Sequence, residues 1–150
     1  ALLGKYDMHA SGGRSYHFQI ADASGKTVVV EYIGNEMNVL EPGDATTVGV
    51  PAEGKTYMAA TNFLLTPGEY DFGGGEDRYA TVMGALEAAD GVMDAQQAMD
   101  TLQSVSREVK IKDNGEVFQT QWSVVYNLDR GTAKICMGGK YDEVHELSIA

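Results

Sequence analysis

Cysteine is almost absent from this 150-residue sequence, which contains Cys136 alone. One cysteine excludes a disulfide within the chain and favours a reducing compartment, so we expect a cytoplasmic protein. Long apolar runs are also missing, because no stretch approaches the roughly 18 residues of a membrane-spanning helix. The sequence therefore predicts no association with a membrane.

Basic residues are scarce as well. The 11 lysines and arginines are outnumbered by 22 aspartates and glutamates, and the formal net charge at pH 7 is −11. A surface of this sign repels the phosphate backbone, which argues against a nucleic-acid partner. Because the repulsion is screened beyond about 8 Å at physiological salt, one well-placed arginine could still hold an anionic group.

The residues that bind metals and phosphates show no matching pattern. His9, His17 and His145 are scattered, without the spacing of metal ligands. The glycines at 73–75 lack the lysine and the serine or threonine of a phosphate-binding loop. We predict no metal site and no cofactor, and interpret the glycine run as a flexible loop that other segments can approach closely.

The periodicity of apolar residues predicts strands on both sides of two helices, in a single domain over 1–150. Asp77 is the expected N-cap of the first helix, and Asp94 with Gln97 forms a capping box for the second. The expected strands are 16–22, 27–32, 36–40, 57–60, 120–127, 132–137 and a last one near 145–149. This order favours an α+β fold in which antiparallel sheet strands pack against a helix pair.

Three details of these elements are specific. Gly34-Asn35 predicts a two-residue hairpin turn between the second and third strands. Alternation from Tyr16 to Ile20 predicts a half-buried first strand. The apolar stripe expected on the second helix consists of Ala95, Ala98, Leu102 and Val105.

Two polar residues occupy positions that their type disfavours. Asn62 ends an apolar segment, where its amide could donate a hydrogen bond to a developing oxyanion, or could bond its own backbone in a turn. Arg78 opens a helix, where its charge opposes the helix dipole at a cost of roughly 0.3–1 kcal/mol. Arg78 could serve a ligand or form a salt bridge with a nearby acid. Cys136 lies in mid-strand with no histidine nearby in sequence, which favours a small apolar core residue over a nucleophile.

Several segments, taken in order, resemble the choloylglycine hydrolases, linear-amide C–N hydrolases that include bile salt hydrolases and penicillin V acylases. The residues His17, Asp22, Ser24, Gly25 and Glu31 match the family's stretch H-x-x-x-x-D-x-S-G-x-x-x-x-x-E. Further similar segments are 61–63 for the family's T-N, 77–79 for its R-F/Y at a helix start, 120–127 for its late W-x-x-V-Y strand, and 140–142 near its end. The order and approximate spacing agree from about Tyr16 onward.

The resemblance implies the layered αββα fold of the N-terminal-nucleophile (Ntn) hydrolases, of which this chain would be the C-terminal portion. In that family the nucleophile is a cysteine that becomes the first residue and whose α-amino group acts as the base. Asn62 would match an asparagine of the oxyanion pocket, and Arg78 would match an active-site arginine. The family's other active-site residues, an arginine, an aspartate and a second asparagine, lie earlier and have no counterpart here.

The nucleophile is the main departure from the family, because Ala1 has an α-amino group but neither a thiol nor a hydroxyl. We therefore expect a C-terminal fragment of a cysteine Ntn hydrolase, inactive alone, whose parent cleaves a small-molecule amide. The missing N-terminal half is an expected partner. Sheet edges and faces left uncovered predict a homo-oligomer. The alternative is a non-catalytic binding or assembly module that keeps the half-fold.

Overall fold

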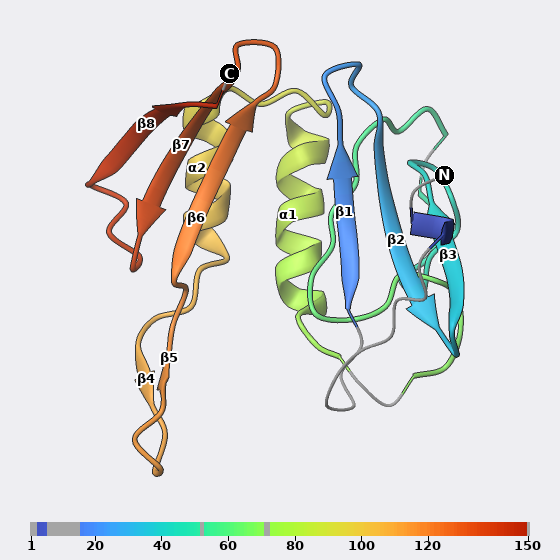
Figure 1. Ribbon diagram of the computed structural model, residues 1–150, viewed down its shortest axis with the longest axis horizontal. Helices are drawn as coiled ribbons and strands as arrows, with labels where there is room; N and C mark the ends of the chain where they lie inside the picture. Colours follow the sequence, from blue (N-terminus) through green and yellow to red (C-terminus); the bar gives the residue numbers. More distant parts are fainter. Residues whose placement is uncertain (1–2, 6–15, 52, 71–72, 150) are drawn as a thin grey trace. The chain divides into compact units, whose positions relative to one another are not determined.

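Antiparallel strands and two helices make up most of the regular structure, as expected for the α+β class (Figure 1). The computed structural model describes residues 3–5, 16–51, 53–70 and 73–149. The chain divides into two compact units, residues 1–79 and 80–150, with the boundary inside the first helix. The assignment of 1–150 to one domain stays a prediction. Neither helix in the described ranges is long and apolar enough to cross a membrane.

The first unit is built on an antiparallel sheet with the strand order β1-β2-β3. Its strands are β1 (His17–Ala21), β2 (Thr27–Ile33) and β3 (Glu36–Leu40), preceded by the short 3-10 helix η1 (Leu3–Lys5). The predicted hairpin turn between β2 and β3 is confirmed. Gly34 and Asn35 both have positive φ, 58° and 70°, as a turn that continues the sheet's right-handed twist requires.

One face of this sheet carries the core of the first unit. Val29 and Leu40 pack with Phe63 and Leu65 from the connection that follows the sheet. The half-burial expected for β1 is wrong for its apolar side, because Tyr16, Phe18 and Ile20 are all exposed. They lie opposite the core face, so the strand turns its polar side toward the packed segments.

The strand expected at 57–60 is not formed, although Ala59 is buried and Met58 packs on the core. The Met58 carbonyl accepts a hydrogen bond of 3.1 Å from the side-chain amide of Gln19 on β1. The segment thus packs against the core face of the sheet, where a side chain bonds it, and it is not paired as a strand.

The first helix, α1 (Glu76–Ala88), begins two residues earlier than expected, since Asp77 as N-cap would have made Arg78 the first helical residue. The Tyr79 N–H donates to the carbonyl of Gly75 at 2.8 Å, which is the first helical hydrogen bond. Asp77 is therefore inside the first turn and is not the N-cap. The acidic side chains of Glu76 and Asp77 lie near the positive end of the helix dipole, which offsets the cost of Arg78.

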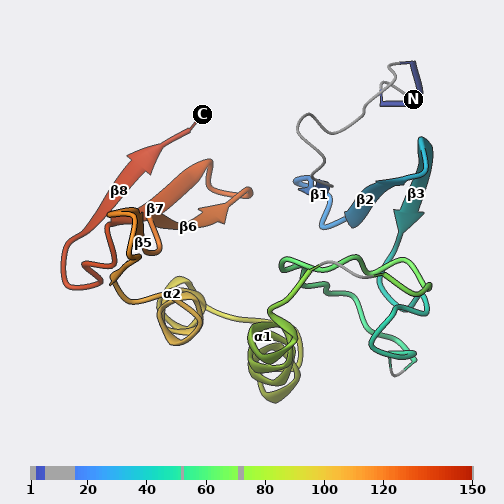
Figure 2. The same cartoon turned by 90° about the horizontal axis from the view of Figure 1, so that it is seen from below.

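The second unit pairs a helix with an antiparallel sheet of strand order β6-β7-β8 (Figure 2). Its elements are α2 (Ala95–Ser104), β4 (Lys110–Ile111), β5 (Val117–Phe118), β6 (Trp122–Asn127), β7 (Thr132–Met137) and β8 (Val144–Ser148). The helix packs on β6 and buries Met99, whereas the predicted stripe is only half-buried. The Tyr141 hydroxyl lies 2.7 Å from Ser123 Oγ on β6 and donates to the Leu102 carbonyl at 3.4 Å, linking sheet and helix.

Candidate active site

Asn62 is an exposed residue at the start of a buried run in the first unit. The next three side chains, Phe63, Leu64 and Leu65, are buried, and two of them belong to the core. On the other side, the Thr61 hydroxyl donates to the Gly75 carbonyl at 3.1 Å. The backbone around Asn62 is therefore anchored while its amide stays accessible to a ligand.

Arg78 contacts Asn62 directly. Its guanidinium Nη2 donates a hydrogen bond of 2.5 Å to Asn62 Oδ1. Because a guanidinium can only donate, the atom that faces it is the amide oxygen, and the two Nδ2 hydrogens remain available as donors. The two residues predicted from the sequence are thus brought together, and their catalytic roles stay predictions.

The neighbouring residues form a second contact between the same two segments. The rings of Phe63 and Tyr79 meet edge to face, with centroids 5.4 Å apart and an interplanar angle of 69°. Burial raises the pKa of the Tyr79 hydroxyl, so this group stays protonated at neutral pH. Residues 62–63 and 78–79 therefore contact each other pairwise, and the apolar pair holds the helix start against the Asn62 segment.

Two glycines of the run at 73–75 allow this close approach. Gly73 has φ +124°, and a Cβ there would lie 2.7 Å from the Phe63 Cα and 2.9 Å from the Asn62 carbonyl oxygen. Gly75 has φ +90°, and a Cβ there would collide with the Arg78 guanidinium. The close approach expected of this run is confirmed, and the glycines adjoin the candidate site itself.

A buried carboxylate lies beneath the same segment, and it was not among the site residues expected from the sequence. Glu31 on β2 is 0% exposed and accepts hydrogen bonds of 2.8 Å from the Leu65 and Thr66 N–H groups. His17 Nδ1 lies 3.3 Å from its Oε1. Burial acts to raise the pKa of Glu31, but the hydrogen bonds from His17, Leu65 and Thr66 outweigh it, so the pKa is lowered. The signal that could have identified Glu31 is a carboxylate inside an apolar strand, which is rarely buried without partners.

Cys136 does not have the environment of a nucleophile. Its side chain is 0% exposed on β7 in the second unit. Burial raises the pKa of its thiol, and the negative charges of Asp142 and Glu143 raise it further. A reactive cysteine needs a lowered pKa and access to substrate. The prediction that Cys136 is a core residue is confirmed.

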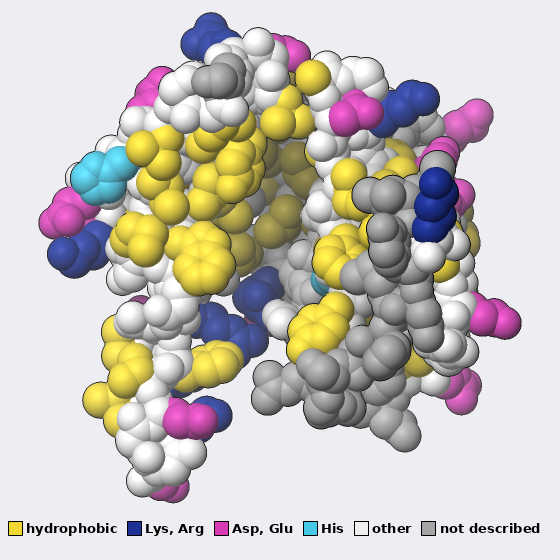
Figure 3. Space-filling model, in the orientation of Figure 1, with side chains coloured by type: hydrophobic (Ala, Val, Ile, Leu, Met, Phe, Trp, Pro, Cys, Tyr) yellow, Lys and Arg dark blue, Asp and Glu magenta, His cyan; other side chains and the backbone are white. Residues whose placement is uncertain are grey.

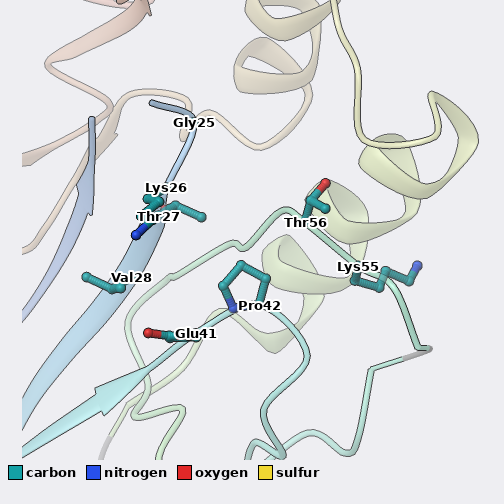
Figure 4. A pocket seen from close by; sticks show the side chains of 8 residues that line it. All are labelled: Gly25, Lys26, Thr27, Val28, Glu41, Pro42, Lys55 and Thr56. Atoms are coloured by element: carbon teal, nitrogen blue, oxygen red, sulfur yellow. The ribbon is translucent and has the colours of Figure 1, made fainter. Parts of the chain in front are cut away.

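The first unit also contains a cavity of about 330 Å³ that Asn62 and Arg78 do not line (Figure 4). Its walls are Gly25, Lys26, Thr27, Val28, Glu41, Pro42, Lys55 and Thr56. The Lys55 ammonium group donates to the Tyr57 hydroxyl at 2.6 Å. Lys26 and Glu41 bring opposite charges to the walls, so the lining does not select one class of ligand. Within the described ranges, no three His, Cys, Asp or Glu residues are grouped to hold a metal ion.

No protein-family model matches this chain, and no curated protein sequence does. The chain is similar in structure to two crystal structures of conjugated bile acid hydrolase from Clostridium perfringens, both of variants. The TM-scores are 0.56 and 0.57, with 17% sequence identity in each case. The alignments cover 88% and 89% of this chain but 49% of the hydrolase chain. The chain thus has the fold of about half of a conjugated bile acid hydrolase, which confirms at the level of the fold the resemblance to choloylglycine hydrolases.

Proposed function

We propose that this chain is the C-terminal half of a hydrolase that cleaves linear amide C–N bonds in small molecules. Two observations support the proposal. The fold matches about half of a conjugated bile acid hydrolase, and the two residues that match the family's active-site motifs contact each other. In the parent, a cysteine thiolate from the missing half attacks the amide carbonyl, the C–N bond breaks and the protonated amine leaves. Water then cleaves the resulting thioester, which releases the acid and restores the thiol.

The hydrogen bond between Arg78 and Asn62 is the observation that carries the proposed mechanism. It occupies Asn62 Oδ1 and turns the Nδ2 hydrogens toward other groups. An amide fixed in this way can donate to the oxyanion of a tetrahedral intermediate without reorganising during the reaction. Arg78 then acts by orienting Asn62 and by placing positive charge near the developing negative charge.

The proposed layered αββα arrangement requires a second sheet to cover apolar strand faces. Each unit has such a face, identified here from exposed side chains. In the first unit they are Tyr16, Phe18, Ile20, Met37 and Val39, and in the second they are Trp122, Tyr126, Met137 and Leu147. Figure 3 shows the apolar side chains gathered over β6, β7 and β8. Faces of this kind are what half of a layered fold would leave uncovered.

The test compares variants of the full-length parent with the 150-residue chain alone. In the parent, Asn62→Ala should lower kcat by about 10²–10³ because one oxyanion donor is lost. Asn114→Ala, which removes an asparagine from the exposed turn between β4 and β5, is the control and should leave kcat unchanged. An unaltered kcat for Asn62→Ala would remove Asn62 from the mechanism.

The isolated chain should release no product from a glycine-conjugated bile acid or from penicillin V, because Cys136 is buried and its pKa is raised. Turnover above the blank would contradict the assignment as a half-enzyme.

The alternative function is a non-catalytic binding or assembly module. The exposed apolar faces of both sheets favour it, since they suit a stable protein partner. The full reading frame separates the two proposals. A cysteine that becomes the first residue after processing is required for the hydrolase and has no role in the module.

A further inference from the structure

The stretch H-x-x-x-x-D-x-S-G-x-x-x-x-x-E over residues 17–31 contributes no residue to the mechanism proposed above. Its five matched residues are His17, Asp22, Ser24, Gly25 and Glu31. Three of them build the turn between β1 and β2. Asp22 Oδ1 accepts hydrogen bonds from the Ser24 N–H at 2.8 Å and from the Ser24 hydroxyl, and Gly25 has φ +83°. The other two, His17 and Glu31, are direct partners in the antiparallel register of the two strands. The spacing of the motif is therefore the geometry of one hairpin that places an imidazole beside a carboxylate.

The Glu31 carboxylate is bonded on both of its oxygens. Oε1 accepts from the Leu65 N–H and Oε2 from the Thr66 N–H, each at 2.8 Å, while His17 Nδ1 lies 3.3 Å from Oε1. A buried charge is unfavourable unless it is paired and hydrogen-bonded, so this carboxylate depends on the groups around it. The Leu65 and Thr66 N–H groups in turn have this carboxylate as their acceptor.

The segment that Glu31 holds is the one that carries Asn62. Residues 61–66 belong to no strand of the described chain, so sheet pairing does not satisfy their backbone groups. Thr47 bonds the carbonyls of this segment, with its hydroxyl donating to Leu64 at 2.7 Å and its N–H donating to Leu65 at 2.9 Å. Glu31 bonds the N–H groups of the next positions. The Glu31 carboxylate thus supplies the acceptors that a neighbouring strand would supply in a sheet. It does so from Leu65 onward, three residues after Asn62.

We propose that Glu31, oriented by His17, is a positioning residue that fixes the backbone of the Asn62 segment and thereby directs the Asn62 amide. The proposal rests on the function proposed for Asn62. Glu31 acts through Leu65 and Thr66, and it does not itself touch the substrate.

The test replaces Glu31 by glutamine in the 150-residue chain and observes it by ¹⁵N–¹H NMR. A glutamine amide offers one acceptor oxygen, and its NH₂ group faces a backbone N–H that also needs an acceptor. Loss of a hydrogen bond to a charged group should speed amide exchange at Leu65 or Thr66 by roughly ten- to hundredfold. The side-chain Nδ2 resonances of Asn62 should shift at the same time. Glu36→Gln, with the same charge change at an exposed site on β3, is the control and should alter neither signal.

Each outcome bears on the proposal. Faster exchange together with shifted Asn62 resonances supports it. Faster exchange with unmoved Asn62 resonances overturns it, because Glu31 would then stabilise its own contacts only, and no change in either signal overturns it too. If Glu31→Gln fails to fold, His17→Ala decides. That variant keeps the carboxylate, and it should shift the Asn62 signals in the same direction by a smaller amount.

The parent enzyme supplies a readout that a merely structural role would not produce. Glu31→Gln should lower kcat with KM nearly unchanged, because a displaced oxyanion donor weakens the transition state and leaves ground-state binding intact. If Asn62→Ala has no effect on kcat while the NMR coupling between Glu31 and Asn62 is present, the proposed function fails and the positioning role stands. The two failures are thus distinguishable.

Discussion

Gly73 lies so close to the Asn62 segment that there is no space for a side chain at this position. A Cβ at this position would lie within 3 Å of two atoms of the Asn62–Phe63 backbone region, and its φ of +124° is unfavourable for any L-residue with a side chain. We expect Gly73→Ala to destabilise the fold by roughly 1–3 kcal/mol from backbone strain alone, with the collision adding to it. Urea unfolding of both proteins measures the difference.

The matched control for this variant is Gly54→Ala. Gly54 also has a positive φ, +82°, but a Cβ there has nothing within 4 Å. The control carries the backbone strain without the collision, so the difference between the two variants isolates the contact with Asn62 and Phe63. Equal losses of stability would show that the approach of the glycine loop to Asn62 is unimportant.

The sequence identified candidate site residues at positions that disfavour their residue type. Asn62 at the end of an apolar segment and Arg78 in a first helical turn both stood out on this ground, and the structure shows that each is the partner of the other. Glu31 was not predicted as a site residue, although a carboxylate inside an apolar strand is a local signal of burial. That signal does not identify its partners, because the Leu65 and Thr66 N–H groups lie more than 30 residues away in the sequence.

Among the helices and strands, the start of α2 is the feature that the sequence encodes most clearly, through its capping box. Asp94 Oδ1 accepts from the Gln96 and Gln97 N–H groups at 2.8 Å, and the Gln97 side chain accepts from the Asp94 N–H at 2.9 Å. Replacing Asp94 by alanine should cost about 1 kcal/mol, because helix N–H groups lose their acceptor. For a chain of this size, that corresponds to a fall in Tm of roughly 2–4 °C in a thermal scan.

Asp100→Ala is the control for the capping prediction. Asp100 is an exposed residue of the same helix, and its carboxylate accepts a side-chain hydrogen bond from Gln96 Nε2 at 2.8 Å. Exposed pairs of this kind contribute about 0.2–0.5 kcal/mol, so its Tm should fall less. Similar decreases for both variants would argue that α2 is held by its packing on β6 and hardly by its cap.

Elements whose signals are local were predicted better than those that depend on distant partners. The β-branched run of β2 and the alternation in β6 and β7 identify those strands to within two residues. The hairpin of β4 and β5 was missed, although Asn114-Gly115 is a turn signal between them, because each strand has only two residues. Residues 57–60 have a strand-like composition, but Met58 packs on the core face of the first sheet, where its carbonyl accepts from the Gln19 side chain, and the segment joins no strand.

For the whole chain, the exposed apolar faces of the sheets β1–β3 and β6–β8 lead us to predict self-association. In the second unit, Trp122 and Tyr126 are each 62% exposed on the side of the sheet away from Ser123 and Cys136. Contiguous apolar faces are rarely left open by monomeric proteins. We expect the chain to form dimers or larger assemblies at micromolar concentration, detectable by light scattering coupled to size exclusion.

Charge placed on that face should disrupt the association. Leu147→Lys introduces a cation among the exposed apolar residues of β6–β8 and should shift the measured mass toward the monomer, because burying the ammonium group would require its desolvation. Val92→Lys is the matched control, since Val92 is 79% exposed but lies in the turn between the helices. A wild-type chain that is monomeric at micromolar concentration would contradict the predicted association. Association abolished equally by both variants would instead point to net charge, and the sheet face would lose its role as the interface.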